Sequence, residues 1–475
     1  MVVLIGRDKE KELFDSLLAS KKAEFVAVYG RRRVGKTFLI RQYLKNEMVF
    51  DFTGTFNESN ALQLASFNRE FKKQCVDNDV IPQNWSEGFA MLSDYLYTLD
   101  STKKVVVFID ELPWLEKAKS GFLAALSYFW NQHGSQMPHL LFVTCGSASS
   151  WIIKNLLRSY GGLHNRVTQS IELKPFTLEE TEAFFKHKNL KFTRYQIVQL
   201  YMAMGGIPFY LQAIKPGKSV NQVIDDLCFD GLLNKEFKPL YHSLFKKANN
   251  HINIITALAK NPYGLSRSQL LQKTQLPPGG TLMRALDNLI ECGFVKKLEP
   301  FEKKNREAVF RVIDFYSIFY LLFIEGNLQE SKNTWQSMAD SQNYISWCGY
   351  AFENICLTHM PQIHKALGIS GMSTKVSSWK HMGTSELPGA QIDLVIDRKD
   401  GLIHLCEVKF TNKEFVLNKE YTAKLRQKRA IFEYATKTKK AVVSSLLSTF
   451  PAIKNEYYLE EIQSEVVIDD LFEKA

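Results

Sequence analysis

The stretch from Glu24 to Leu44, EFVAVYGRRRVGKTFLIRQYL, decides the fold of the N-terminal part of this chain. It opens with an apolar, β-rich run (Phe25–Tyr29) and closes with apolar residues at helical spacing. The octet between them, Gly30–Thr37, fits the phosphate-binding loop pattern G-x-x-x-x-G-K-[ST]. Because so short a pattern also arises by chance, its place between a predicted strand and a predicted helix makes it informative. The stretch therefore predicts a strand–loop–helix unit.

The loop contains the residue types that nucleotide binding requires. Gly30 and Gly35 let the backbone curl, so that successive N–H groups face phosphates at a helix N-terminus. Lys36 then reaches the β- and γ-phosphates, and the Thr37 hydroxyl ligates Mg²⁺. We therefore predict that ATP or ADP binds here together with Mg²⁺. The predicted contact residues are Gly30, Arg31, Arg32, Arg33, Val34, Gly35, Lys36, Thr37 and Phe38.

An acidic pair follows a second predicted strand. In KKVVVFIDELPW, the continuous apolar run Val105–Ile109 is typical of a strand covered on both faces. Asp110 is expected to hold Mg²⁺ through its water shell, and Glu111 to orient and deprotonate the attacking water. An Asp-Glu pair that stands alone is more often a solvated turn, but the phosphate-binding loop upstream favours a nucleotide site.

Further strands predict the sheet that joins these motifs. Met48–Phe56, His139–Ser147 and Ser170–Phe176 are β-rich and alternate with helical stretches, which indicates a doubly wound, mostly parallel α/β sheet. Ligands bind at the carboxyl ends of the strands in such sheets. Ser147 falls at that edge, where two interpretations stay open. It senses the γ-phosphate, or it caps the helix that follows.

Several motifs in the first half of the chain resemble those of a known family. They are IGRDKEKELFDSLL near the start, the phosphate-binding loop, FIDELPW, TCGSASSW and GGIPFYL. Together they resemble the archaeal-type ATPases of the AAA+-related STAND class of P-loop NTPases, over roughly residues 1–240. The resemblance implies that Arg166 faces the γ-phosphate, and that Pro208 with the Gly205–Gly206 pair places a helical lid over the nucleotide. The implied adenine contacts are Ile5, Gly6 and Arg7.

Two of these implied roles have simpler alternatives. Without the family, Arg166 is most often a surface charge. The Gly205–Gly206 pair before Pro208 is then only a helix end followed by a turn.

Residues 246–314 have the pattern of a winged helix-turn-helix. Three short amphipathic helices are followed by two strand-like runs, FVKKLEPF and AVFRVIDF. The third helix, from Thr281, is the expected recognition helix. The expected wing is the charged turn with Lys303, Lys304 and Arg306.

This module predicts contacts with DNA. Arg284 and Asn288 lie one turn apart and are expected to face a groove, while Lys296 and Lys297 touch phosphates. The alternative is a module that only joins domains, which the two carboxylates on the same helix favour.

The C-terminal part of the chain carries a second group of residues that are suited to metal-dependent catalysis. In GAQIDLVIDRKDGLIHLCEVKF, strands are expected at Ile392–Asp397 and Leu402–Phe410, joined by a turn. Side chains repeat every two residues along a strand, so Glu407 and Lys409 share one face, and Asp393 lies opposite them if the hairpin closes. This set suits Mg²⁺-dependent phosphodiester cleavage. Asp393 and Glu407 hold the metal, and Lys409 positions or helps activate the attacking water.

The order of these residues resembles the PD-(D/E)XK nuclease superfamily, and more narrowly the C-terminal domain often fused to archaeal-type ATPases. The resemblance covers about residues 305–430 and adds Glu353, on an expected helix, as a site residue. The sequence departs from the motif at Gln391–Ile392, which stand in place of its proline, and at Lys380, where relatives often carry a second Trp. The alternative is a cross-strand ion cluster on the sheet surface.

A basic stretch, Lys413–Lys440, follows this hairpin. Two interpretations stay open for it: a helix that docks a phosphate backbone, or a solvated helix face. The cations concerned are Lys424, Arg426, Lys428 and Arg429.

Composition limits the remaining possibilities. The chain has 475 residues, enough for about three domains, and its net charge of +10 favours a polyanionic partner such as double-stranded DNA. Its seven scattered cysteines include no C-x-x-C pair, so neither a zinc site nor a disulfide framework is indicated. The start has no signal-peptide layout, and the most apolar stretch, Phe315–Ile324, is too short to span a bilayer. We expect a cytoplasmic protein with no membrane contact.

The predicted fold class is α/β, with a doubly wound parallel P-loop NTPase domain (1–176), a helical lid (177–245), a winged helix-turn-helix (246–314) and an α/β restriction-endonuclease-like domain (315–475). The first functional hypothesis is an ATPase whose nucleotide state controls a Mg²⁺-dependent, DNA-directed nuclease-like domain. The second is a STAND-type nucleotide switch, forming a homo-oligomer with ATP, whose nuclease-like scaffold is inert. A third is a transposition or defence ATPase that acts on another protein.

Overall fold

The computed structural model describes residues 3–76, 80–158, 161–277, 280–301, 308–327, 334–339, 341–385 and 387–475. The chain divides into two compact units, one formed by Met1–Pro175 with Glu291–Gly293, the other by Phe176–Ile290 with Phe294–Ala475. Across these described ranges, no helix has both the length and the apolar composition needed to cross a membrane. The predicted wing residues Lys303, Lys304 and Arg306 lie outside the described residues.

The first unit is built on a five-stranded sheet in which every neighbouring pair is parallel, as the sequence predicted. The strands follow the order β2-β3-β4-β1-β5 across the sheet. They are β1 (Glu24–Tyr29), β2 (Met48–Thr53), β3 (Val105–Asp110), β4 (Leu140–Gly146) and β5 (Gln169–Glu172). The α-helices are α1 (Asp8–Leu18), α2 (Lys36–Tyr43), α3 (Asn60–Gln74), α4 (Trp85–Tyr97), α5 (Phe122–Gln132) and α6 (Ser149–Ile152).

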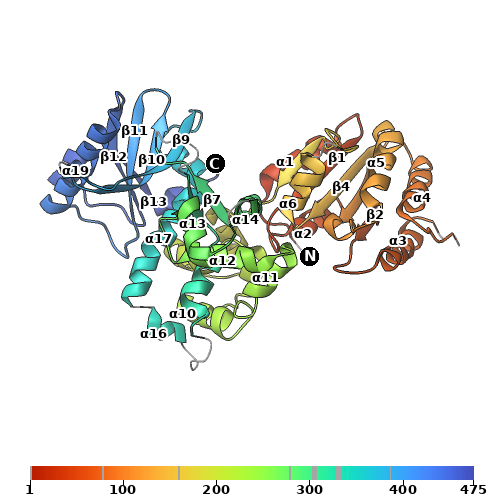
Figure 1. Ribbon diagram of the computed structural model, residues 1–475, viewed down its shortest axis with the longest axis horizontal. Coiled ribbons are helices and arrows are strands. Elements are labelled where there is room, and N and C mark those ends of the chain that lie inside the picture. Colours follow the sequence, from red (N-terminus) through yellow and green to blue (C-terminus); the bar gives the residue numbers. More distant parts are fainter. Residues whose placement is uncertain are drawn as a thin grey trace. The chain divides into compact units, whose positions relative to one another are not determined.

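Both faces of this sheet are buried, since consecutive residues of β1 point to opposite sides and none of Phe25, Val26, Ala27 and Val28 is exposed. One face packs against α3, α4 and α5, which Figure 1 shows beside the sheet. Aromatic side chains dominate this core, and each contributes roughly 2–3 kcal/mol when fully buried. They include Phe50, Phe52, Phe67, Phe71, Trp85, Phe89, Phe122, Phe129, Trp130 and Phe142.

The strand order brings distant segments together. Because β4 lies between β1 and β3, the carboxyl ends of these three strands are neighbours. The phosphate-binding loop follows β1, Asp110 ends β3, and Ser147 follows β4. Three motifs that are far apart in the sequence therefore meet at one edge of the sheet.

The second unit begins with helices and a small sheet. The helices are α7 (Leu178–His187), α8 (Arg194–Met204), α9 (Pro208–Gln212), α10 (Val220–Ile224), α11 (Phe237–Leu244), α12 (Ala248–Ala259), α13 (Arg267–Thr274) and α14 (Gly280–Glu291). The antiparallel sheet has the order β6-β8-β7, with β6 (Leu265–Ser266), β7 (Val295–Leu298) and β8 (Val309–Val312). Three helices with a β-hairpin thus occur where the winged helix was predicted. Its identity as a winged helix stays a prediction.

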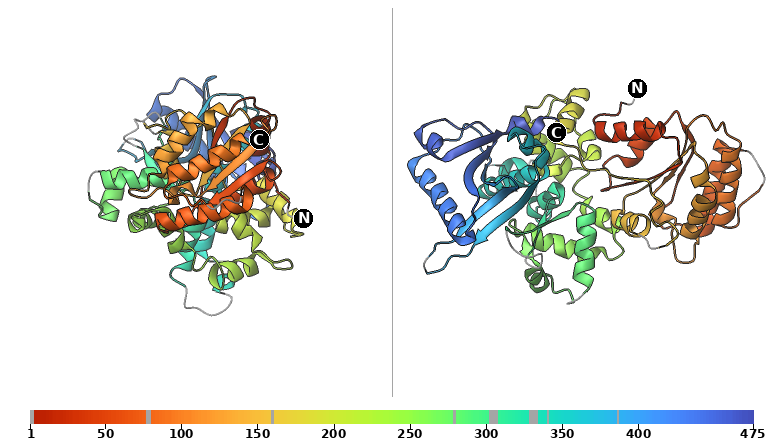
Figure 2. Two further views of the ribbon diagram at one scale, coloured as in Figure 1. Left: turned by 90° about the vertical axis from the view of Figure 1, so that its right-hand side faces the viewer. Right: turned by 90° about the horizontal axis from the view of Figure 1, so that it is seen from above.

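The rest of the second unit contains a mixed five-stranded sheet of order β13-β12-β11-β10-β9, in which β9, β10 and β11 are antiparallel and β11, β12 and β13 are parallel. Helix α19 packs against β10 and β12 and runs along this sheet (Figure 1, Figure 2). The strands are β9 (Thr374–His381), β10 (Ala390–Arg398), β11 (Leu402–Lys409), β12 (Ala441–Ser448) and β13 (Ile462–Val467). The helices are α15 (Phe315–Phe319), α16 (Thr334–Met338), α17 (Gln342–Thr358), α18 (Met360–Ala366), α19 (Lys419–Thr436) and α20 (Glu456–Glu461). A separate C-terminal mixed sheet is therefore observed, while the bounds of the predicted domain and its nuclease-like identity stay predictions.

Candidate functional site

The loop between β1 and α2 depends on its two glycines. Gly30 has φ +147° and Gly35 has φ +93°, a region that side chains with a Cβ rarely adopt. At Gly30 there is also no room, because a Cβ atom would lie 2.2 Å from the carbonyl oxygen of Leu173. The backbone therefore curls at both positions, as the motif predicted.

Lys36 is the first residue of α2 and is only 5% exposed. Its Nζ donates to the carbonyl oxygens of Gly30 (3.0 Å) and Arg31 (3.1 Å). It also lies 3.3 Å from the Ser147 hydroxyl oxygen. The ammonium group is thus held over the loop by carbonyls that a phosphate oxygen can replace as its partner.

The metal-ligand candidates of this unit are in direct contact. The Thr37 hydroxyl donates to Asp110 Oδ2 at 2.8 Å. The other oxygen, Oδ1, accepts from the Glu111 backbone N–H (2.8 Å) and from the Cys145 thiol (2.6 Å). Hydroxyl and carboxylate oxygens are the ligand types that Mg²⁺ prefers, so this pair fits the metal.

Cys145 is a functional neighbour that the sequence did not reveal. It is fully buried at the end of β4, and burial followed by the charge of Asp110 raises the pKa of its thiol well above the usual range. The thiol therefore acts as a hydrogen-bond donor that orients Asp110.

Glu111 adopts the left-handed conformation, with φ +47°, which is uncommon outside glycine and asparagine and is enriched at functional sites. Its Oε1 accepts a hydrogen bond from the Ser147 hydroxyl (2.6 Å), and Oε2 accepts from the Ser147 backbone N–H (3.2 Å). The N-cap position of α6 is occupied by Ala148. The interpretation of Ser147 as a helix cap is therefore wrong, and its hydroxyl instead links Glu111 to Lys36.

The arginines implied in nucleotide contact differ in their surroundings. Arg7 is 5% exposed, and its guanidinium donates to the carbonyl oxygens of Lys174 (2.8 Å) and Val34 (3.0 Å). Arg31 is buried, while Arg32 and Arg33 are partly exposed. Arg7 therefore connects the segment before α1 to the phosphate-binding loop. Its contact with adenine stays a prediction.

Three other predicted residues take no part in the contacts described above. Arg166 is exposed in the turn before β5, and its guanidinium has no hydrogen bond or ion pair with any described residue. Gly6 has φ +63°, and Pro208 begins α9 in the second unit. The roles of these three residues stay predictions.

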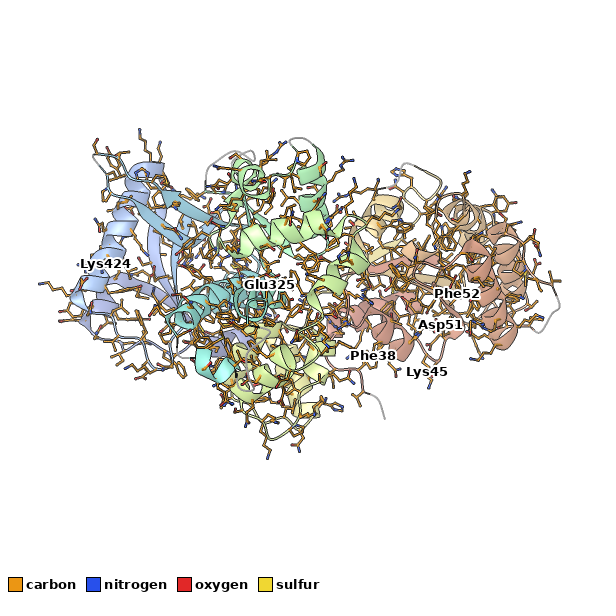
Figure 3. The ribbon with its side chains drawn as sticks, turned by 60° about the horizontal axis from the view of Figure 1, so that its bottom comes forward. Phe38, Lys45, Asp51, Phe52, Glu325 and Lys424 are labelled. Carbon is orange, nitrogen blue, oxygen red and sulfur yellow. The ribbon has the colours of Figure 1, made fainter. Side chains whose placement is uncertain are left out.

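Helix α2 is fixed to the sheet by a residue outside the motif. Arg41 donates to both carboxylate oxygens of Asp51 on β2, at 2.6 and 2.9 Å. Figure 3 labels Asp51 and Phe38 in the first unit, and Phe38 is 40% exposed. The Arg41–Asp51 pair holds the helix that begins at Lys36.

The parallel sheet, the curled loop, the Thr37–Asp110 contact and the Glu111 after it define the first unit as a P-loop nucleotide-binding domain. Residues 4–214 match the model of a family described as an ATPase domain predominantly from Archaea. The chain therefore carries an archaeal-type P-loop ATPase domain.

Individual proteins and solved structures are similar to the chain over stretches of different length. An uncharacterized protein of Methanocaldococcus jannaschii is 23% identical over 411 residues, which cover 83% of this chain and 84% of that protein. An uncharacterized ATP-binding protein of the same organism is 39% identical over 49 residues, 10% of this chain and 83% of that protein. Among solved structures, a Walker-type ATPase of Pyrococcus abyssi is 18% identical with a TM-score of 0.47, covering 67% of this chain and 96% of its own. The ORC2 protein of Aeropyrum pernix is 13% identical with a TM-score of 0.42, covering 71% and 96%.

The second predicted site lies on β10 and β11. In their antiparallel register Leu394 faces Cys406 and Val395 faces Leu405. Asp393 follows next on β10, where the pairing with β9 shifts register between Ile392 and Val395, and it is close enough to Glu407 for the two charges to interact. Lys409, two residues beyond Glu407, forms an ion pair with it at 2.9 Å. The hairpin therefore closes as predicted and places these side chains together.

Glu407 has partners from α19 as well. Lys428 Nζ lies 2.9 Å from its carboxylate, and the Tyr421 hydroxyl donates to it. Burial opposes ionisation of Glu407, but the charges of Lys409 and Lys428 outweigh burial and lower its pKa to about 2. Glu407 is thus held ionised by three groups, two of which come from a helix that the motif does not include.

Glu353, on α17, completes the predicted set. It is 9% exposed and forms an ion pair with Arg311 on β8 at 2.9 Å. Burial, and next the charge of Asp393, raise its pKa to about 7, while burial and the charge of Glu407 raise the pKa of Asp393. The carboxylates therefore influence one another, although no group of three or more His, Cys, Asp or Glu side chains among the described residues is placed to hold a metal ion.

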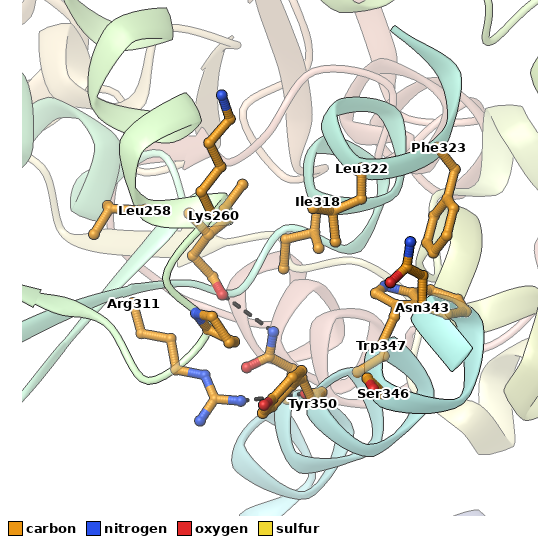
Figure 4. Close-up of a pocket in the computed structure, with 15 residues that line it drawn as sticks. Leu258, Lys260, Arg311, Ile318, Leu322, Phe323, Asn343, Ser346, Trp347 and Tyr350 are labelled. Atoms are coloured by element: carbon orange, nitrogen blue, oxygen red, sulfur yellow. Dashed lines mark hydrogen bonds between the residues drawn. The ribbon is translucent and has the colours of Figure 1, made fainter. Parts of the chain in front are cut away.

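A pocket of about 320 Å³ adjoins this cluster. Figure 4 shows Arg311 and Tyr350 on one side of it and Leu322, Phe323 and Trp347 on the other. Arg311 Nη2 donates to the Tyr350 carbonyl oxygen at 3.2 Å. Arg311 thus lines the pocket while it pairs with Glu353.

Several residues predicted to touch DNA have partners inside the second unit. Lys296 Nζ donates to the carbonyl oxygen of Leu357 (3.1 Å), and the Asn288 amide lies 3.4 Å from His251. Packing against α17 and α12 therefore engages both side chains in this structure, and their contacts with DNA stay predictions. Arg284 is exposed and donates to the Gly280 carbonyl oxygen.

The basic residues of α19 are also paired. Lys424, which Figure 3 labels on this helix, contacts Glu420 at 2.7 Å. Together with the Lys428–Glu407 pair, these contacts favour the ion-paired helix over a phosphate-docking surface. The remaining pairs are Arg426–Glu460 (2.6 Å), Arg426–Glu461 (3.4 Å) and Arg429–Glu461 (3.0 Å).

Proposed function

We propose that the first unit binds ATP with Mg²⁺ and hydrolyses it. The observation that carries this proposal is the direct contact of Thr37 with Asp110 beside the buried Lys36. Lys36 exchanges its loop carbonyls for the β- and γ-phosphates, Thr37 and Asp110 hold the metal, and Glu111 accepts a proton from the attacking water. Mg²⁺ neutralises phosphate charge when bound. Ser147, which now bonds both Lys36 and Glu111, lies where the γ-phosphate is expected.

ATP binding is expected to stabilise the first unit. At a hundredfold excess over its dissociation constant, a ligand adds about 2.7 kcal/mol, which corresponds to a rise in Tm of roughly 5–10 °C for a unit of this size. Differential scanning calorimetry of the full chain with ATP and Mg²⁺ measures the shift. Lys36→Ala is expected to lose it, and Lys45→Ala, on the same segment, is the matched control. An equal shift in the wild type and in Lys36→Ala contradicts the assignment of the loop.

For the second unit we propose Mg²⁺-dependent cleavage of double-stranded DNA, controlled by the nucleotide state of the first unit. The support is the Glu407–Lys409 ion pair on β11, with Asp393 on β10 and Glu353 on α17 close enough for their charges to interact. Asp393 and Glu407 supply the oxygen ligands, and Lys409 positions the water. The net charge of +10 favours a polyanionic substrate.

Asp393→Asn is expected to lower DNA cleavage by about 100-fold, because it removes one charged metal ligand without changing the shape of the side chain. Linear and supercoiled DNA are incubated with the full chain, Mg²⁺ and either ATP or ADP, and the products are separated on a gel. Asp397→Asn, on the same strand but outside the set, is expected to retain cleavage. If the wild type leaves DNA intact in every condition, the nuclease proposal fails.

A second candidate function is a nucleotide switch with an inert nuclease-like scaffold. Each of Glu353 and Glu407 already has a cationic partner, which favours this alternative. It predicts that exchange of ADP for ATP changes the oligomeric state, measured by light scattering, while DNA stays intact.

A further inference from the structure

The pocket beside Arg311 has walls that are mainly apolar. Its volume of about 320 Å³ is close to the lower end of the range of about 300–1,000 Å³ that is usual for small-molecule sites. Part of the wall is formed by the side chains of Leu322, Phe323, Trp347 and Tyr350 (Figure 4). No Asp or Glu is found among the described residues that line it. The pocket therefore has the size and the surface for a molecule of one or two aromatic rings.

Two buried polar atoms of the lining residues have no hydrogen-bond partner in the described part of the chain. They are Nε of Arg311 and Oδ1 of Asn354, whose residues are 5% and 2% exposed. The Asn354 amide nitrogen donates to the carbonyl oxygen of Val312, the residue after Arg311 on β8, at 3.1 Å. This bond determines which end of the amide is left over. One N–H donor and one C=O acceptor are therefore unused where β8 and α17 form the pocket, and unused polar atoms are destabilising when they are buried.

We propose that this pocket binds a small, neutral aromatic molecule with a lactam or primary-amide edge, whose carbonyl oxygen accepts from Arg311 Nε and whose N–H donates to Asn354 Oδ1. The pocket belongs to the second unit, and the proposal goes beyond the functions given above. It depends neither on ATP hydrolysis nor on DNA cleavage, and no metal ion takes part in it.

The polar atoms favour a neutral ligand over an anion. Nη2 of Arg311 lies 2.9 Å from a carboxylate oxygen of Glu353 and also donates to the Tyr350 carbonyl oxygen. When Glu353 is ionised, it balances the charge of the guanidinium group. A carboxylate ligand would add a second negative charge close to Glu353, which is costly in a buried place. It would also have no proton to donate to Asn354, whereas a lactam supplies both an acceptor and a donor.

The apolar walls favour a ring over a water molecule alone. Water can bond to both free polar atoms, but it gains nothing from contact with Phe323 and Trp347. A flat ring removes apolar surface of these side chains from water and can stack against them or meet them edge-to-face. The combination of aromatic walls with one free donor and one free acceptor is therefore best matched by an aromatic lactam or amide.

The experiment measures the binding of isocarbostyril, a two-ring lactam, to the full chain by isothermal titration calorimetry. The titration is done at pH 8, above the pKa of about 7 of Glu353, and with excess ADP and Mg²⁺ to compete for the first unit. Asn354→Leu is expected to weaken binding about tenfold, because the N–H of the lactam loses its acceptor in a buried site. N-methylisocarbostyril, which lacks that N–H, is expected to bind the wild type about tenfold more weakly than isocarbostyril does. Its affinity is expected to be the same in Asn354→Leu, because it makes no bond to Asn354.

Asn343→Leu is the matched control. Asn343 lies on the same helix and lines the pocket, but it is exposed, so this variant is expected to bind isocarbostyril as the wild type does. Arg311 is not substituted, because Glu353 would then lose its cation. If Asn354→Leu fails a circular dichroism check of folding, Ser346→Trp replaces it. Ser346 is an exposed lining residue, and an indole there is expected to narrow the pocket and to weaken the binding of both lactams about tenfold.

Three results overturn the proposal: no detectable binding of isocarbostyril, equal binding to the wild type and Asn354→Leu, and equal binding of the two lactams to the wild type. For Ser346→Trp the corresponding result is an unchanged affinity. The two-ring carboxylate naphthoate is expected to bind more weakly than isocarbostyril, and tighter binding of naphthoate overturns the assignment of a neutral ligand. ATP turnover and DNA cleavage are not measured, so failure of the functions proposed above leaves this test intact.

Discussion

Glu111→Gln is expected to lower ATP turnover by about 1,000-fold while ATP still binds. The change keeps the shape of the side chain, and an amide oxygen can still accept the hydrogen bond from the Ser147 hydroxyl. It removes the basicity with which a carboxylate takes a proton from water, and general bases of this kind contribute about 10²–10⁴-fold. The phosphate and metal contacts of Lys36 and of the Thr37–Asp110 pair are untouched.

The measurement is steady-state release of phosphate, together with equilibrium binding of a fluorescent ATP analogue. Glu116→Gln is the matched control, because Glu116 also lies after β3 but accepts from the Leu123 backbone N–H at the start of α5. It is expected to keep turnover within about twofold. Unchanged turnover in Glu111→Gln means that another group accepts the proton.

The first site was predictable from the sequence because its main motif is contiguous. The two glycines of Gly30–Thr37 determine how the loop curls without help from distant residues. Asp110 is recognisable because it ends a continuous apolar strand. The role of Ser147, just after β4, was not decidable in the same way. The choice between a helix cap and a γ-phosphate contact for this residue depends on β4 lying between β1 and β3, and strand order is a long-range property.

The second site was predictable only along its own hairpin. The two-residue period of a strand places Glu407 and Lys409 on one face, and the short turn pairs the strand of Asp393 with theirs. Arg311 lies on β8, and the sequence around it does not indicate that it pairs with Glu353. Lys428 is one of several cations on a basic helix, and its pairing with Glu407 depends on how α19 packs on the sheet.

Long-range packing also determines the partner of Lys296 in this structure. A lysine in a hairpin next to a predicted recognition helix suggests a phosphate contact. Lys296 instead donates to the end of α17, more than sixty residues away in the sequence. Local pattern identifies the charge of such a residue, whereas its partner is set by the tertiary fold.

Gly30→Ala is expected to destabilise the first unit by about 4 kcal/mol, a large part of the 5–15 kcal/mol that stabilises a typical domain. The motif explains only part of this effect, since φ +147° costs an alanine about 1–3 kcal/mol. The larger part comes from Leu173, whose carbonyl oxygen would lie 2.2 Å from the new Cβ. Backbone cannot rotate away as a flexible side chain does, and Leu173 is fixed by its own N–H bond to the Tyr29 carbonyl oxygen. The end of β5 must therefore separate from β1, or the loop must open.

Gly121→Ala separates the two contributions. Gly121 has φ +69° in the same unit, before α5, and a Cβ there meets no atom within 4 Å. This variant bears the conformational cost without the clash, so a loss of only about 1 kcal/mol is expected. Calorimetry of the nucleotide-free full chain gives the two changes in stability. Hydrogen exchange locates them, because Gly30→Ala should release protection in β1 and β5 while Gly121→Ala leaves those strands protected. Similar losses in the two variants mean that the approach of Leu173 to Gly30 does not constrain the loop.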